Sequence, residues 1–352
     1  MLLKIIHQTE LSYTDPISET VMELRMAPRQ EQDQHRLSFT LALGPAASVA
    51  SYFDWLGNTV HIFTIQPFHQ SVRISATSVV ETDRPRKEPE RFRDTWPLAP
   101  DAFDYTLYDY LQFGGPVVDS PELRQLTNVL APEQGTSLGE LALRMLHLID
   151  DKFVYKKGIT TSASPITDIL TTGGGVCQDF THLMLGMARA MKIPARYVSG
   201  IVHPDANRFR GFTQTHAWCE LLFPSAGWIG FDPTNRCVVG GNFVKVAVGR
   251  DYRDVPPSKG QYTGKGKETI DVAVRSEELN SIPPELAAER FQSLDVATVA
   301  DGHAGHMEFF NQQIEHQQQQ QQQQRLNRSC GLWQSPTKLT PLIPSPCTRG
   351  EG

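Results

Sequence analysis

The sequence is poor in cysteine, with five cysteines among 352 residues. Closely spaced cysteines in even number would indicate a disulfide framework or a paired zinc site. The five present are odd in number and far apart, so neither is predicted, and we expect a reducing compartment, the cytoplasm, with no metal or other cofactor. They are Cys177, Cys219, Cys237, Cys330 and Cys347.

Long apolar runs are also absent. A membrane-spanning helix needs about 18 apolar residues in a row, and no such stretch occurs. The N-terminal MLLKIIHQTE has only a short apolar run before His7, whereas a secretory signal needs roughly 7–15 such residues. The net charge is −6 and the pI is near 6.0, so basic residues are not in excess. We expect neither export nor binding to membranes or nucleic acid.

Alternating apolar residues are present in the first part of the chain. Residues 39–43 and 72–76 alternate apolar with small or polar side chains, which predicts strands with one solvated face. Residues 1–82 are therefore expected to form a small antiparallel β domain. The charged, proline-bearing residues 83–96 are typical of a linker.

Helical periodicity begins after the predicted linker. SLGELALRMLHLIDD opens with Ser137 three residues before Glu140, which is a capping box. A second periodic segment runs from Cys177 to Pro194, with apolar residues at spacings of three and four. Strand-like stretches follow, including THAWCELLF and GWIGFDPT. Residues 97–275 are expected to form an α+β domain.

The end of the chain has a different composition. Eight glutamines run from Gln317 to Gln324, and the last residues are rich in proline, serine and threonine. Such a segment cannot bury enough apolar surface to order itself, so residues 276–352 are predicted to be a disordered, low-complexity tail.

Cys177 follows three glycines and would lie at the start of a helix. Unpaired N–H groups and the helix dipole favour a thiolate there, and the glycines let the backbone turn sharply and approach a substrate. The alternative is that Cys177 is a small buried residue, as most cysteines are.

A thiol nucleophile needs a base that a third group orients. His216 begins one strand-like stretch, and Asp232 ends the next, 16 residues later. If they face each other across a hairpin, its centre falls near Pro224, and their equal parity sends both side chains to one sheet face. A lone strand histidine is more often structural, but the matched aspartate and the upstream cysteine favour a site.

The stretches GGGVCQDFTHLMLGMARAMKIPARYVSG, THAWCELLF and GWIGFDPT together resemble the core of transglutaminase-like cysteine enzymes, over residues 137 to 236. The first 80 residues resemble, more weakly, the N-terminal region of bacterial members. The resemblance implies an α+β, papain-like core in which a cysteine-bearing helix packs on an antiparallel sheet. It also implies that Cys177 is the nucleophile, His216 the general base and acid, and Asp232 the residue that orients His216.

This resemblance predicts acyl transfer from a peptide or protein amide through a thioester on Cys177. The Cys177 N–H is one expected oxyanion donor, and the sequence does not identify a second. Animal transglutaminases carry calcium sites, but no D-x-D-x-D-G loop occurs here, so calcium dependence is not expected. Cross-linking and hydrolysis need the same residues, with hydrolysis slightly favoured. The alternative function is a non-catalytic peptide-binding or assembly module.

Four residues near these motifs have more modest predicted roles. His182 is expected to make a structural contact, and Asp179 to complement the helix N-terminus. Cys219 has the opposite parity to His216 and is expected in the core. Trp218 shares the face of His216, and we expect it either to line the substrate channel or to pack. The sequence does not predict the oligomeric state.

Overall fold

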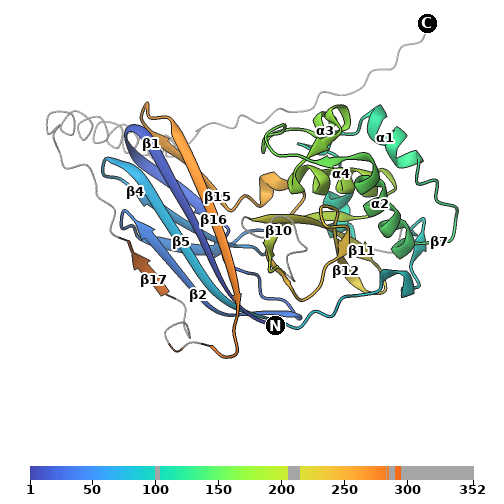
Figure 1. Cartoon of the computed structure of the whole chain (residues 1–352), viewed down its shortest axis with the longest axis horizontal. Coiled ribbons are helices and arrows are strands. Elements are labelled where there is room, and N and C mark those ends of the chain that lie inside the picture. Colours follow the sequence, from blue (N-terminus) through green and yellow to red (C-terminus); the bar gives the residue numbers. More distant parts are fainter. Residues whose placement is uncertain (100–103, 205–214, 283, 285–289, 295–352) are drawn as a thin grey trace, which may run out of the picture. The chain divides into compact units, whose positions relative to one another are not determined.

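The computed structural model describes residues 1–99, 104–204, 215–282, 284 and 290–294 (Figure 1). The α+β prediction is confirmed, with a β-rich N-terminal region and a mixed α+β core. Among the described residues, no helix is long and apolar enough to cross a membrane.

The N-terminal region is built around one long strand, β1 (Leu2–Leu24). Its first half pairs with β5 and its second half with β4, all antiparallel, and the register shifts between Ser12 and Ile17. The two halves thus belong to two layers, which enclose an apolar cluster that includes Leu11, Phe39 and Phe63. The other strands of this region are β2 (Gln34–Gly44), β3 (Val49–Phe53), β4 (Thr59–Ile65) and β5 (His69–Thr82).

Strands from the far end of the chain complete these layers. β15 (Ser258–Thr263) pairs with the second half of β1, and β16 (Glu268–Glu278) pairs with its first half. Figure 1 shows these orange strands beside the blue β1. β17 (Arg290–Ser293) adds to β2 in parallel. The predicted boundary at residue 275 is therefore wrong, because strand pairing brings residues 258–278 to the N-terminal sheet. From residue 295 the predicted tail lies outside the described residues.

The predicted linker at residues 83–96 is anchored to the α+β core. It contains a short 3₁₀ helix, η1 (Pro89–Arg91), and ends in β6 (Thr95–Trp96), which pairs with β7 (Thr136–Ser137). The Trp96 indole Nε1–H donates to the Met191 carbonyl at 2.9 Å, and the ring of Phe92 lies edge-on to that of Phe223. Charge and proline predicted a solvated segment, but its aromatic residues pack.

The second part has helices on one face of a five-stranded antiparallel sheet of order β13-β12-β11-β10-β14 (Figure 1). Helix α4 (Cys177–Ala190) packs on this sheet through Leu183, Met184 and Met187, which share one apolar cluster with Cys219 of β11. The other helices are α1 (Pro121–Asn128), α2 (Leu138–Lys152) and α3 (Ile166–Thr172), with the 3₁₀ helices η2 (Tyr105–Leu111) and η3 (Tyr252–Asp254). The strands are β8 (Val154–Tyr155), β9 (Gly174–Gly175), β10 (Ala195–Val202), β11 (His216–Phe223), β12 (Gly227–Asp232), β13 (Cys237–Val238) and β14 (Phe243–Gly249).

A buried ion-pair network connects β11 with β10, β14 and the N-terminal region. Glu220 of β11 is 3% exposed and accepts from Arg196 and from Lys245, each at 2.6 Å. The Lys245 ammonium also donates to Glu31 at 2.7 Å. Burial disfavours a charged Glu220, but the two cations outweigh it and lower its pKa to about 2. The carboxylate is therefore charged at neutral pH.

Candidate active site

The backbone before Cys177 is shaped by glycines. Gly173 ends α3 with a φ of +71°, a left-handed conformation that glycine adopts without strain. A Cβ on Gly175 would lie 2.7 Å from the Cβ of Asp179, so only glycine lets the loop pass this close to the helix. As predicted, the loop then turns directly into α4, whose first residue is Cys177.

Asp179, in the first turn of α4, hydrogen-bonds to this loop. Its Oδ2 accepts from the Val176 N–H at 2.8 Å and from the Thr160 hydroxyl at 2.6 Å. The side chain is buried, and burial raises the pKa of Asp179 above its usual value. The sequence analysis predicted only the electrostatic complement to the helix. The structure adds that Asp179 fixes the residue immediately before Cys177.

His216 and Asp232 meet as predicted, on one side of the sheet. His216 Nε2 lies 2.8 Å from Asp232 Oδ2, and both side chains have 0% exposure. The turn between their strands centres on Ser225, because Phe223 pairs with Gly227. The predicted centre at Pro224 is therefore one residue early, and the two side chains meet diagonally.

Asp232 also accepts from the turn that follows it. Its Oδ1 accepts from the N–H groups of Thr234 at 2.9 Å and Asn235 at 3.2 Å, and its Oδ2 accepts from the Asn235 side chain at 2.6 Å. Asn235 Nδ2 lies 3.4 Å from His216 Nε2. The sequence analysis missed Asn235. The stretch DPTN could have indicated it, since an aspartate often accepts from N–H groups two and three residues on.

The charge of the His216 ring depends on these neighbours. Burial disfavours the imidazolium, but the Asp232 carboxylate, with a further contribution from Cys177, raises the pKa of His216 to about 10. An ionised carboxylate can only accept, so Nε2 carries a proton. Nδ1 is buried and has no hydrogen-bond partner among the described residues. It is therefore the nitrogen left to exchange a proton with the neighbouring thiol.

Trp218 packs beside the histidine. Its indole ring centre lies 6.4 Å from that of His216 and 5.4 Å from that of Phe243, and the side chain is 0% exposed. Gly200 makes room for it, since a Cβ there would lie 2.3 Å from the indole. This burial favours the packing role, and contact with substrate stays a prediction.

The three described cysteines have different surroundings. Cys177 is half-buried, whereas Cys219 is in the core, as predicted, and burial raises the pKa of its thiol far above the usual range. Cys237 pairs with Asp232 across β12 and β13, and burial raises its thiol pKa to about 12. Cys330 and Cys347 lie outside the described residues.

His182 makes the structural contact that was expected. Its Nε2 accepts from the Tyr252 N–H at 3.1 Å, and its ring lies 5.0 Å from that of Tyr197. Burial lowers its pKa to about 3, so His182 is neutral at physiological pH. Within the described ranges, no three His, Cys, Asp or Glu side chains are grouped as metal ligands would be.

Comparison with known proteins places these elements in a family. Residues 124–233 match the model of the transglutaminase-like superfamily, and residues 3–81 match that of the bacterial transglutaminase-like N-terminal region. An uncharacterized protein of Mycobacterium leprae is 32% identical over 283 residues, which cover 77% of this chain and 97% of the relative. The chain belongs to the transglutaminase-like superfamily. As a member of it, the chain is also 29% identical over 291 residues to an uncharacterized Mycobacterium tuberculosis protein, covering 77% of this chain and 91% of that one.

Two further matches bear on this transglutaminase-like chain. A crystal structure described as that of a candidate cysteine protease from Cytophaga hutchinsonii aligns with a TM-score of 0.63 and 24% identity, covering 80% of this chain and 93% of that one. At this identity the match shows a shared fold. A protein-glutamine gamma-glutamyltransferase of Pseudomonas aeruginosa is 29% identical over 126 residues, which cover 34% of this chain and 19% of that enzyme.

Proposed function

We propose that the protein is a cysteine-dependent enzyme that transfers the acyl group of a peptide or protein amide through a thioester on Cys177. One observation carries the proposal. Asp232 holds Nε2 of the buried His216 at 2.8 Å, which leaves the unpartnered Nδ1 to serve Cys177 at the start of α4. A nucleophile, a base and a group that orients the base are the parts that covalent catalysis by a thiol needs.

The proposed reaction has two halves. His216 Nδ1 takes the thiol proton, and the Cys177 sulfur attacks the amide carbonyl carbon. The carbon–nitrogen bond then breaks, and the imidazolium gives its proton to the leaving amine. In the second half, water or a primary amine loses a proton to His216 and attacks the thioester, and the carbon–sulfur bond breaks. The N–H of Cys177, in the first turn of α4, has no acceptor within the helix and is free to bind the oxyanion.

The same residues serve hydrolysis and transamidation. Water is the more abundant acceptor, so we favour a peptidase or amidase reaction. The short match to a protein-glutamine gamma-glutamyltransferase supports the amine as the second candidate acceptor.

The test is to incubate the purified full chain with a peptide library, with and without a fluorescent primary amine, and to analyse the products by mass spectrometry. Cleaved peptides would indicate hydrolysis, and peptides carrying the amine would indicate transamidation. Cys177→Ala must abolish both. If the wild-type chain forms neither product, but binds peptides as tightly as Cys177→Ala does, it is a binding module instead.

A further inference from the structure

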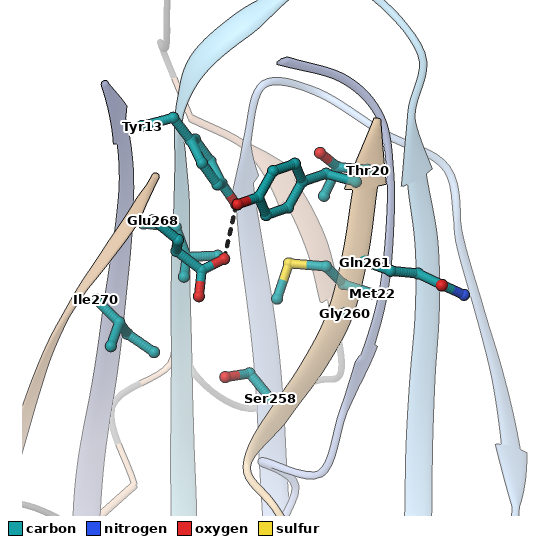
Figure 2. Close-up of a pocket in the computed structure, with 10 residues that line it drawn as sticks. Tyr13, Thr20, Met22, Ser258, Gly260, Gln261, Glu268 and Ile270 are labelled. Carbon is teal, nitrogen blue, oxygen red and sulfur yellow. Dashed lines mark hydrogen bonds between the residues drawn. The ribbon is translucent and has the colours of Figure 1, made fainter. Parts of the chain in front are cut away.

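A small cavity lies in the N-terminal region, between β15 and β16, which residues 264–267 connect (Figure 2). β15 and β16 pair with different halves of β1 and not with each other, so they belong to different layers. The space between them measures about 90 Å³, and none of the residues around it belongs to the candidate active site. They are Leu11, Tyr13, Thr20, Met22, Ser258, Gly260, Gln261, Tyr262, Glu268 and Ile270.

The inner wall of this cavity is aromatic and apolar. Tyr13 and Tyr262 lie edge to face, with ring centres 4.9 Å apart, and Leu11 and Met22 are buried beside them. The face of an aromatic ring attracts a cation within about 6 Å of its centre. The wall therefore offers a cation both aromatic rings and apolar contacts.

One carboxylate lines the cavity on its solvent-exposed side, that of Glu268. Glu268 Oε2 accepts from the Tyr13 hydroxyl at 3.2 Å, and Figure 2 shows the Glu268 side chain turned toward Tyr13 and Met22. Its second oxygen, Oε1, has no hydrogen-bond partner among the described residues. Glu268 is the one charged residue of the ten, and no lysine, arginine or histidine lines the cavity. Its charge is therefore unmatched within the cavity and favours a positively charged ligand.

The size and position of the cavity narrow the choice of cation. Pockets for whole small molecules measure roughly 300–1,000 Å³, so this one suits the end of a single side chain. Methylene groups would pack on Met22 and Ile270, and an ammonium would donate to Glu268. Within the described residues, β15 and β16 pair only with β1, so each leaves a strand edge along which an extended polypeptide can bind.

We propose that this tyrosine–glutamate pocket binds a lysine side chain of a polypeptide partner. The ammonium contacts the Glu268 carboxylate and the rings of Tyr13 and Tyr262, and the aliphatic part lies against Met22. The proposal goes beyond the reaction proposed for Cys177 and does not depend on it.

The test uses the full chain with Cys177→Ala, so that no acyl transfer can consume a probe. A short capped peptide with one lysine is titrated against protein with ¹³C-labelled tyrosine rings, and the ring shifts are followed by NMR. We expect the peptide to bind at least tenfold more tightly than its Nε-acetylated form. Glu268→Gln should weaken binding at least tenfold, whereas Glu277→Gln, which changes another exposed carboxylate on the same strand that does not line the cavity, should leave it unchanged.

Two further variants distinguish the loss of the Tyr262 ring from a loss of folding. Tyr262→Phe keeps the aromatic face and should bind the peptide, and Tyr262→Leu should weaken binding while leaving the melting temperature close to that of Tyr262→Phe. Equal binding of the acetylated peptide, or unchanged binding by Glu268→Gln, would overturn the proposal. Binding of butylammonium without binding of the peptide would also overturn it, because the ligand would then be a free amine.

Discussion

His216 and Asp232 join β11 and β12 along a diagonal of their ladder. Cys219 pairs with Phe231, so the next position in register places Asp232 opposite Trp218 and not opposite His216. Diagonal neighbours are farther apart than direct ones, but long side chains still reach each other. The bond of 2.8 Å therefore requires the imidazole to lean along its strand, where the indole of Trp218 lies beside it. The strands and the indole together set the direction of the ring.

Removing the charge of Asp232 should lower the pKa of His216, and with it the pH up to which the ring stays an imidazolium. At about 5 Å and an effective dielectric near 20, the carboxylate stabilises the imidazolium by about 3 kcal/mol, or up to about 2 pKa units. In the wild type the pKa of His216 is raised to about 10, so the imidazolium persists to that pH. In Asp232→Asn, the upper limb of the pH profile for alkylation of Cys177 by iodoacetate should move down by roughly 1–2 units. The imidazolium attracts this anionic reagent, so the rate falls again at the pH where the ring loses its charge, and the profile is bell-shaped.

The control is Asp150→Asn, which removes an exposed carboxylate paired with Arg236. It should leave the upper limb of the pH profile for alkylation of Cys177 unchanged. Asp232→Asn should also be more active than Asp232→Ala, because an amide oxygen can still accept from Nε2. Its amide nitrogen must then face the N–H groups of Thr234 and Asn235, so some loss is expected. If the upper limb of the profile does not move in Asp232→Asn, the charge of Asp232 does not raise the pKa of His216.

Cys177 should be the most reactive of the three described thiols. Cys219 is buried, and Cys237 has a pKa raised to about 12, so both are almost fully protonated at pH 6. Cys177 is half-buried beside the imidazolium of His216. Iodoacetamide at pH 6 should therefore modify Cys177 roughly a hundredfold faster or more, measured by peptide mass mapping. Equal rates at Cys177 and Cys237 would contradict an activated thiol.

Local patterns predicted the parts of the site but not its register. Parity placed His216 and Asp232 on one face because side chains alternate with period two, and this holds for any turn that is centred on a residue, such as Pro224 or Ser225. The exact centre depends on the turn residues, and sequence alone put it one residue early. Asn235 was missed because its contact follows from the turn after Asp232, which no periodicity describes. The start of α4 at Cys177 was predicted because glycines and a regular apolar spacing mark it locally.

Pairing between distant segments was not predictable in the same way. β15 and β16 join β1 across more than 230 residues of chain, from Leu24–Ser258 onward. β15 is short and polar, whereas TIDVAV in β16 alternates and predicts a strand, but alternation does not identify the strand with which it pairs. The pattern gave no partner for them, so the domain boundary was placed wrongly. The tyrosine–glutamate pocket lies between these strands, so it could not be predicted from the sequence for the same reason.

Adding one methyl group to Gly175 should disturb the nucleophile loop. The new Cβ would lie 2.7 Å from both the Cβ and Oδ2 of Asp179, so that side chain must move away from the Val176 N–H. We expect Gly175→Ala to lower the free energy of unfolding by about 1–3 kcal/mol and to slow alkylation of Cys177. Gly114→Ala is the control, because nothing lies within 4 Å of its Cβ position. If both variants unfold and react alike, the close approach at Gly175 has no role.

The buried Glu220 should make the fold sensitive to acid. Burial would raise the pKa of Glu220, but the charges of Arg196 and Lys245 outweigh burial and lower it from the usual 4.5 to about 2. A depressed pKa contributes stability that is complete above about pH 4.5 and is lost as the pH falls toward 2. The shift corresponds to about 3 kcal/mol. Glu220→Gln should therefore be less stable than the wild type by about 3 kcal/mol at pH 7, measured by urea unfolding, and the difference should shrink between pH 5 and 3.

The control is Glu10→Gln, which breaks the exposed pair with Arg73 and should change stability by less than about 1 kcal/mol at either pH. A difference for Glu220→Gln that is constant from pH 7 to 3 would mean that its charge contributes nothing, and that the variant acts through packing alone.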